Sequence, residues 1–204
     1  MVLAVQRDVP GAILDATELL LARYGYRKMT VEEIAREAGI GKGSIYLHFS
    51  SKEEVVLSHV DRIIQRLNEQ LQEICRSESS AAERLCEMLL TRVLFRFDSV
   101  QHYRQSLNDL LAEVRPNLLA RRAKYFEAEA QVFAELLEAG CRSGEFACAD
   151  TLATAYGVLE ATNSLLPYSL SPKELGQRDE VRKRTLAVAN LLLRGLLNAK
   201  SETR

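Results

Sequence analysis

Apolar residues recur at three- and four-residue intervals along almost the whole chain, and this spacing predicts α-helices. Prolines, glycines and short polar runs mark the helix ends. No segment shows the strict alternation of apolar and polar residues that a half-buried strand would have. The pattern predicts an all-α protein of about nine helices, over residues 10–24, 30–38, 42–48, 50–76, 81–97, 100–114, 117–141, 150–166 and 180–198.

The stretch TVEEIAREAGIGKGSIYLHF, residues 30–49, predicts two short helices joined by a tight turn. Thr30 and Glu33 have the spacing of a capping box, and Gly39 suits the left-handed residue that ends a helix. The second helix begins with small and basic residues, which is the layout of a helix-turn-helix motif. Its apolar positions predict the core of the hairpin, formed by Ile34, Ala38, Ile40, Ile45 and Phe49.

Residues 50–76 predict a long amphipathic helix that continues from this hairpin into the rest of the chain. We therefore expect two domains, a three-helix DNA-binding domain over residues 1–54 and a larger helical bundle over 55–204. The long helix would connect the two as a lever.

The last two predicted helices carry apolar residues on more than one side. Small residues repeat every four positions in one of them, which allows another helix to approach closely. Three consecutive leucines in the other point in three directions. We expect a dimer interface here, with a central helix of a monomeric bundle as the alternative. The interface candidates are Ala153, Gly157, Ala161, Val188, Leu192 and Leu196.

Composition restricts the range of functions. The net charge of −1 means that a DNA-binding surface must be local. The apolar run at residues 1–5 is too short for a signal peptide, and no run of about 20 apolar residues could span a membrane, so we expect a cytoplasmic protein. The four cysteines lack metal-ligand spacing and are interpreted as small buried hydrophobes, with thiol sensing as the alternative. No cofactor or metal ion is expected.

The segment TVEEIAREAGIGKGSIYLHFSSKEEVV resembles the DNA-binding segment of TetR-family transcriptional repressors. The match is dense over about residues 10–57, and beyond it only the helical layout agrees. The resemblance implies a homodimer on a palindromic DNA operator, released when a small-molecule effector enters the C-terminal bundle. Together with the physical roles of these residue types, it assigns DNA binding to Thr30, Gly41, Lys42, Gly43, Ser44, Tyr46, His48 and Lys52.

Aromatic and polar residues of the bundle are candidates for lining the effector site. Because few charges lie among the apolar faces, we expect a largely apolar or amphipathic ligand. The candidates are Phe95, Tyr103, Leu107, Asn108, Leu111, Tyr125, Phe126, Phe133, Tyr156, Leu159, Thr162 and Asn163.

Two other functions compete with the regulator hypothesis. A protein-interaction module without DNA binding would have the same hairpin. A bundle enzyme would need paired carboxylates or repeated Glu-x-x-His spacing, and the three histidines have no such partners. We therefore expect a DNA-binding regulator rather than an enzyme.

Overall fold

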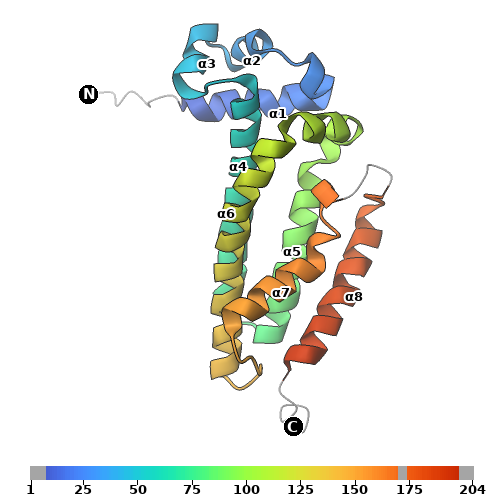
Figure 1. Ribbon diagram of the computed structural model, residues 1–204. Coiled ribbons are helices and arrows are strands. Elements are labelled where there is room, and N and C mark those ends of the chain that lie inside the picture. The colour runs from blue at the N-terminus through green and yellow to red at the C-terminus, as the bar shows by residue number, and fades with distance from the viewer. Residues whose placement is uncertain (1–7, 170–173, 198–204) are drawn as a thin grey trace, which may run out of the picture. The chain divides into compact units, whose positions relative to one another are not determined.

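The computed structural model describes residues 8–169 and 174–197, except for the side chain of Gln105. Within these ranges the chain forms α-helices and short 3₁₀-helices and no strand, which confirms the all-α class (Figure 1). The elements are α1 Val9–Lys28, α2 Val31–Ala38, α3 Lys42–His48, α4 Lys52–Cys75, α5 Ala81–Ser99, η1 Gln101–Ser106, α6 Leu107–Arg142, α7 Thr151–Asn163, η2 Pro167–Ser169 and α8 Arg178–Leu196.

One long helix replaces two predicted ones. Pro116 was expected to begin a new helix, but it lies inside α6. A proline in a helix lacks one N–H donor and crowds the preceding turn. The leucine, alanine and arginine residues on both sides favour helix and offset that cost. The expected end of the last helix at residue 198 lies outside the described residues.

The chain divides into two compact units. The first comprises residues 1–62 and 102–118, and the second comprises residues 63–101 and 119–204. Helices α4 and α6 each contribute residues to both units. The predicted domain boundary between residues 54 and 55 stays a prediction.

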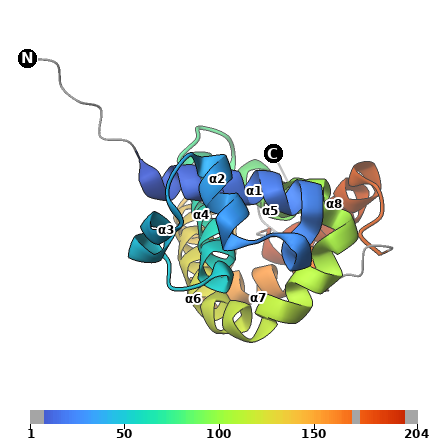
Figure 2. The same cartoon turned by 90° about the horizontal axis from the view of Figure 1, so that it is seen from above.

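In the first unit α1 packs against α2, and α2 packs against α3 (Figure 2). The hairpin core is as predicted, except that Ile40 is half-buried. Helix α1 contains Gly25 at φ 72°, a backbone conformation that favours glycine, and then continues to Lys28. The core of this unit includes Ile13, Leu20, Leu21, Ile34, Ala35, Ala38, Ile45, Phe49, Val55 and Val56.

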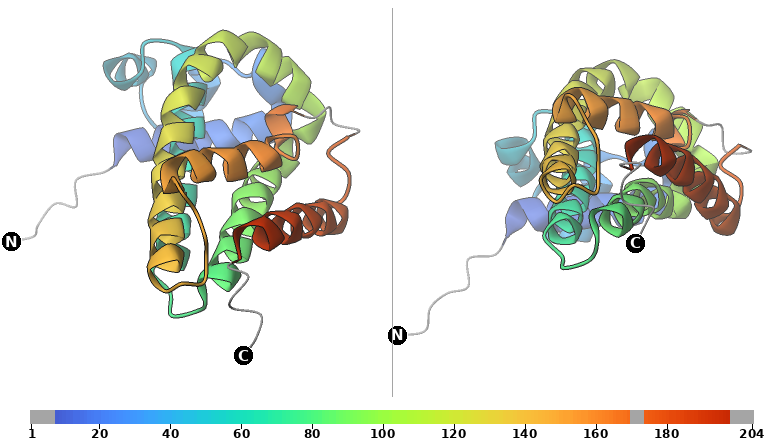
Figure 3. Two further views of the ribbon diagram at one scale, coloured as in Figure 1. Left: turned by 60° about the horizontal axis from the view of Figure 1, so that its bottom comes forward. Right: turned by 90° about the horizontal axis from the view of Figure 1, so that it is seen from below.

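The second unit has its own apolar core. Helix α8 packs along α5 and contacts α7, and Figure 3 shows these three helices from below. The loop between α6 and α7 is held by Glu145, whose carboxylate accepts hydrogen bonds from the N–H groups of Ala81 and Ala82, both at 2.8 Å. The core includes Leu67, Leu71, Leu85, Met88, Leu89, Phe133, Leu136, Leu137, Val158, Leu159 and Ala189.

Candidate nucleic-acid interface

The hairpin of α2 and α3 has the backbone geometry that its sequence predicts. The Glu33 N–H donates to the Thr30 hydroxyl at 3.2 Å, and the Thr30 N–H donates to the Glu33 carboxylate at 2.9 Å. These reciprocal bonds form the capping box. Gly39 has φ 66° and closes α2, donating its N–H to carbonyls of the last turn. Local capping therefore fixes the direction in which α3 begins.

Helix α3 is amphipathic over only seven residues. Ile45 is completely buried, and Phe49, which caps the helix, is also buried. On the opposite side, large apolar side chains are exposed to solvent, since Tyr46 is 50% exposed and Leu47 is 83% exposed. His48 is exposed as well, and Ser44 is half-buried. This side of α3 is the outward surface of the hairpin.

Gly41 and Gly43 are not required by the packing of this chain. A Cβ atom placed on either glycine would meet nothing within 4 Å. The start of α3 therefore offers bare backbone to the outside, as the sequence argument for close approach to DNA requires.

Lys42 lies across the hairpin from α2. Its ammonium forms an ion pair and hydrogen bond with the Glu32 carboxylate, and both side chains are at least half exposed. The hydrogen bond to Lys42 holds the pKa of Glu32 below its usual value, and the same bond raises the pKa of Lys42. A phosphate approaching Lys42 therefore competes with Glu32.

Lys52 has a different environment from the one expected of a phosphate ligand. Its Nζ donates to the carbonyls of Tyr26 at 3.0 Å and Met29 at 3.2 Å, and lies 4.1 Å from the Tyr26 ring centroid. Partial burial lowers the pKa of Lys52. Lys52 thus joins the start of α4 to the end of α1, and its predicted phosphate contact stays a prediction.

The predicted ligand-lining residues are divided between the two units, and their role stays a prediction. Tyr103, Leu107, Asn108 and Leu111 belong to the first unit, and the other candidates belong to the second. Asn108 is exposed, whereas Phe133, Leu159 and Thr162 are completely buried. In the second unit the rings of Phe126 and Tyr156 lie 5.7 Å apart between centroids. Half-buried side chains complete the set, namely Phe95, Tyr125 and Asn163.

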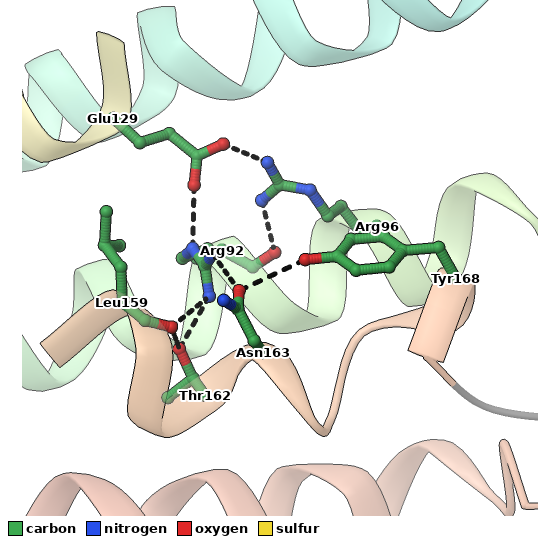
Figure 4. A network of polar contacts seen from close by, with 7 residues as sticks. All are labelled: Arg92, Arg96, Glu129, Leu159, Thr162, Asn163 and Tyr168. Atoms are coloured by element: carbon green, nitrogen blue, oxygen red, sulfur yellow. Dashed lines mark hydrogen bonds and ion pairs between the residues drawn. The ribbon is translucent and has the colours of Figure 1, made fainter. Parts of the chain in front are cut away.

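A buried polar network lies within the mostly apolar interior of the second unit (Figure 4). Arg92 and Arg96 of α5 both bind the Glu129 carboxylate of α6, the Arg92 Nε at 2.7 Å. Arg92 and Glu129 are each 1% exposed. Burial is the largest influence on both groups, and it lowers the pKa of Arg92. Burial alone would raise the pKa of Glu129, but the positive charges of Arg96 and Arg92 hold it below its usual value. Three charged side chains therefore lie within an interior that is otherwise mostly apolar, and the apolar or amphipathic character of a ligand stays a prediction.

Other residues complete the coordination of Arg92. Its guanidinium donates to the Leu159 carbonyl at 3.3 Å, to the Thr162 hydroxyl at 2.6 Å and to the Asn163 side-chain oxygen at 2.9 Å. The Tyr168 hydroxyl donates to the same Asn163 oxygen at 3.1 Å. In Figure 4 Glu129 lies on one side of Arg92, and Thr162 and Asn163 lie on the other. Arg92 thus joins α5, α6 and α7.

The predicted interface residues on α7 lie at the surface. Ala153, Gly157 and Ala161 are all exposed, and a Cβ on Gly157 would meet nothing within 4 Å. On α8, Leu191 is 68% exposed. The three α8 candidates are half-buried: Val188, Leu192 and Leu196. Their role in an interface stays a prediction.

The four cysteine thiols are free. Cys75 is buried, and all four belong to the apolar core of the second unit or pack against it. Burial raises the pKa of Cys75 and Cys86, and burial with a hydrogen bond involving Cys141 raises the pKa of Cys148 to about 11. Thiols held protonated are poor nucleophiles, which favours their interpretation as small hydrophobes.

The sequence contains signals for the residues that were missed. Arg92 and Arg96 continue the buried positions of α5 at helical spacing, where apolar residues were expected. Leu47 is an exposed leucine between two polar positions of α3. In the described ranges no group of three or more metal-binding side chains is found, and no helix there is long and apolar enough to cross a membrane.

Residues 13–58 match the family model described as bacterial regulatory proteins, tetR family. The fatty acid metabolism regulator protein of Bacillus subtilis is 33% identical over 73 residues, which are 36% of this chain and 38% of that protein. The HTH-type transcriptional repressor KstR2 of Mycobacterium tuberculosis (strain ATCC 25618 / H37Rv) is 27% identical over 140 residues, which are 67% of this chain and 68% of that protein.

Solved structures share the fold. A transcriptional regulator from Cytophaga hutchinsonii superposes with a TM-score of 0.76 at 21% identity, covering 92% of this chain and 98% of that one. The regulator FadR from Bacillus subtilis, in complex with stearoyl-CoA, superposes with a TM-score of 0.62 at 20% identity, covering 91% and 98%.

Proposed function

The chain belongs to the tetR family of bacterial regulatory proteins, and from that membership we propose that it is a DNA-binding transcriptional regulator of the cytoplasm and not an enzyme. The observation that carries this proposal is the outward side of α3. There, bare backbone at Gly41 and Gly43 lies beside the exposed side chains of Lys42, Tyr46 and His48. A short helix with open backbone and polar side chains fits the major groove of DNA.

The residues divide into positioning and reading groups. Lys42 and Tyr46 are suited to phosphate oxygens, and such contacts fix the register of the protein on the duplex without reading sequence. Ser44 and His48 can hydrogen-bond to base edges. Leu47, the most exposed large apolar residue of the described chain, is suited to contact a thymine methyl group. Thr30 and Lys52 lie at the starts of helices, where free N–H groups attract phosphate.

The regulator acts as a homodimer on a palindromic operator. One hairpin covers one half-site, so two copies are needed, with recognition helices roughly 34–36 Å apart or a multiple of that spacing. The exposed small residues of α7 support a second copy of α7 and α8 as the partner surface. Two-fold symmetry is the commonest arrangement of such assemblies.

A small effector binds in the helical bundle and releases the repressor from DNA. The complex of the FadR relative with stearoyl-CoA supports an amphipathic ligand with a long apolar part. The ligand shifts the dimer between two arrangements because it binds one of them more tightly.

Selection from a random duplex library tests this function. The purified full-length chain is expected to enrich a palindrome whose half-sites are about one helical turn apart or a multiple of it. Enrichment of no sequence, together with no retention of duplex DNA, contradicts the proposal and favours a protein-interaction module.

A further inference from the structure

The buried network of the second unit contains more positive than negative charge. Arg92 and Arg96 face a single carboxylate, that of Glu129. The Glu129 carboxylate attracts the charge of Arg92 and raises the pKa of Arg92, whereas the like charge of Arg96 repels it and lowers that pKa. A buried charge is costly unless an opposite charge compensates it. The network is therefore one anion short of neutrality.

The two arginines differ in how many of their N–H donors make hydrogen bonds. The guanidinium of Arg92 makes bonds through all three of its nitrogens, to Glu129, Leu159, Thr162 and Asn163. Arg96 makes two hydrogen bonds, to the Arg92 carbonyl at 3.2 Å and to Glu129. A guanidinium has five N–H donors, so Arg96 retains donors for another acceptor.

Arg96 is also the more exposed arginine of this pair. Its side chain is 10% exposed, against 1% for Arg92. Asn163 and Tyr168 are half-buried and continue the network toward the surface. The Arg122 guanidinium lies 4.6 Å from the Tyr168 ring centroid and adds a further positive charge near that end.

We propose that Arg96 is a receptor for the carboxylate of an amphiphilic ligand, which completes the Arg92–Glu129–Arg96 network. The carboxylate is the head group of the effector, so this proposal rests on the proposed function of the chain. The planar fork of a guanidinium matches a carboxylate with two parallel hydrogen bonds.

Charge balance selects the class of head group. One monoanion neutralises the single excess charge of the three buried groups, Arg92, Arg96 and Glu129, whereas a phosphate dianion would leave these three groups and the ligand with a net negative charge. The surroundings favour an apolar remainder of the molecule, because Arg92 binds the backbone carbonyl of Leu159, a residue of the same apolar core as Phe133. A carboxylate with an apolar chain satisfies both conditions.

Calorimetric titration of the full-length chain with octanoate tests the proposal. Octanamide has the same chain without the charge, and inorganic phosphate and sodium chloride at equal ionic strength test other anions. Octanoate is expected to bind one site per chain at least about tenfold more tightly than octanamide, since a hydrogen bond to a charged group is the stronger kind. Equal affinity for octanamide overturns the proposal, as does tighter binding of phosphate or an equal response to chloride.

A pair of variants locates the site. Arg96→Gln is expected to weaken octanoate binding about tenfold or more while leaving octanamide unchanged. Arg178→Gln is the matched control, because Arg178 pairs with Asp98 at 2.9 Å on the surface of the same unit. Equal loss in both variants overturns the assignment to Arg96. If Arg96→Gln does not fold, the comparison of octanoate with octanamide on the unmodified chain still decides.

Binding of duplex DNA, measured on the same preparation, distinguishes a failure of the carboxylate site from a failure of the regulator function. DNA binding without octanoate binding overturns the carboxylate site and leaves the regulator function standing. Octanoate binding without DNA binding supports the site and contradicts the regulator function.

Discussion

At the scale of residues, the pair of Lys42 and Glu32 has opposing consequences for DNA. Glu32 holds the Lys42 ammonium and also carries a charge that repels phosphate. Glu32→Gln is therefore expected to raise affinity for duplex DNA by up to about fivefold at low salt, in a fluorescence anisotropy titration.

Glu37→Gln is the matched control, since Glu37 lies on the same helix but pairs with Arg23 at 3.6 Å. It removes the same charge without freeing Lys42, so its effect should be smaller. An equal rise in both variants would show that the pairing with Lys42 does not matter.

Gly43 separates stability from DNA binding. Because a Cβ there meets nothing within the chain, Gly43→Ala should leave the free energy of unfolding unchanged or raise it by up to about 1 kcal/mol. The added methyl group would stand between the backbone of α3 and the DNA, so affinity should fall by about tenfold or more. Denaturant unfolding and anisotropy measure the two quantities. Unchanged affinity would remove Gly43 from the interface.

Residue environments were predictable from the sequence only where the cause is local. The capping box at Thr30 and the buried positions of the hairpin depend on spacing within a few residues. The environment of Lys52 depends on carbonyls at the end of α1, 23 and 26 residues away in sequence. No local pattern indicates such a contact.

At the scale of elements, helix types and most boundaries followed from apolar spacing. The exceptions were α6 and the end of α1, which was predicted at residue 24 and lies at Lys28. A proline is a strong signal for a helix end when sequence alone is available. Pro116 instead lies inside a helix of 36 residues. The contribution of good helix formers on both sides is distributed over many positions and gives no single signal.

The network joining α5, α6 and α7 makes stability depend on pH. Glu129 has a lower pKa in the folded chain than in the unfolded one. Its stabilising contribution is therefore present above the unfolded pKa of about 4.3 and is lost as the pH falls through the folded pKa. At neutral pH, Glu129→Gln should cost about 3–5 kcal/mol, because it leaves two buried arginines without a counter-charge.

Thermal unfolding of both proteins between pH 3 and pH 7 measures this dependence. The difference between them should shrink below about pH 4.3, since a protonated Glu129 resembles glutamine. A difference that stays constant over this range would mean that the charge of Glu129 does not stabilise the network.

At the scale of the whole molecule, we propose that two copies assemble through α7. Gly157→Leu should leave the chain folded, because the position is open, but should block close approach of a second copy. Ala123→Leu, at another exposed position of the same unit, is the control. Sedimentation velocity should show monomers for the first variant and dimers for the second. A dimer of Gly157→Leu contradicts the interface assignment.

The overall organisation was predictable in part. The helical class and the DNA-binding hairpin followed from residue spacing and from the resemblance of about 50 residues to one family. A division into two parts was also expected, but the place of residues 102–118 in the first unit was not predictable, because they lie far along the chain. Contacts between distant segments decide that division.

If the hairpin of α2 and α3 binds duplex DNA, the affinity must depend steeply on salt, and a salt titration measures this dependence. Anisotropy of a labelled duplex should show binding at 50 mM salt. The logarithm of the binding constant should then fall linearly with the logarithm of salt concentration, by roughly three orders of magnitude or more up to 200 mM if six or more phosphates are contacted. No binding at 50 mM salt, or binding that does not depend on salt, would mean that the hairpin does not bind duplex DNA through phosphate contacts.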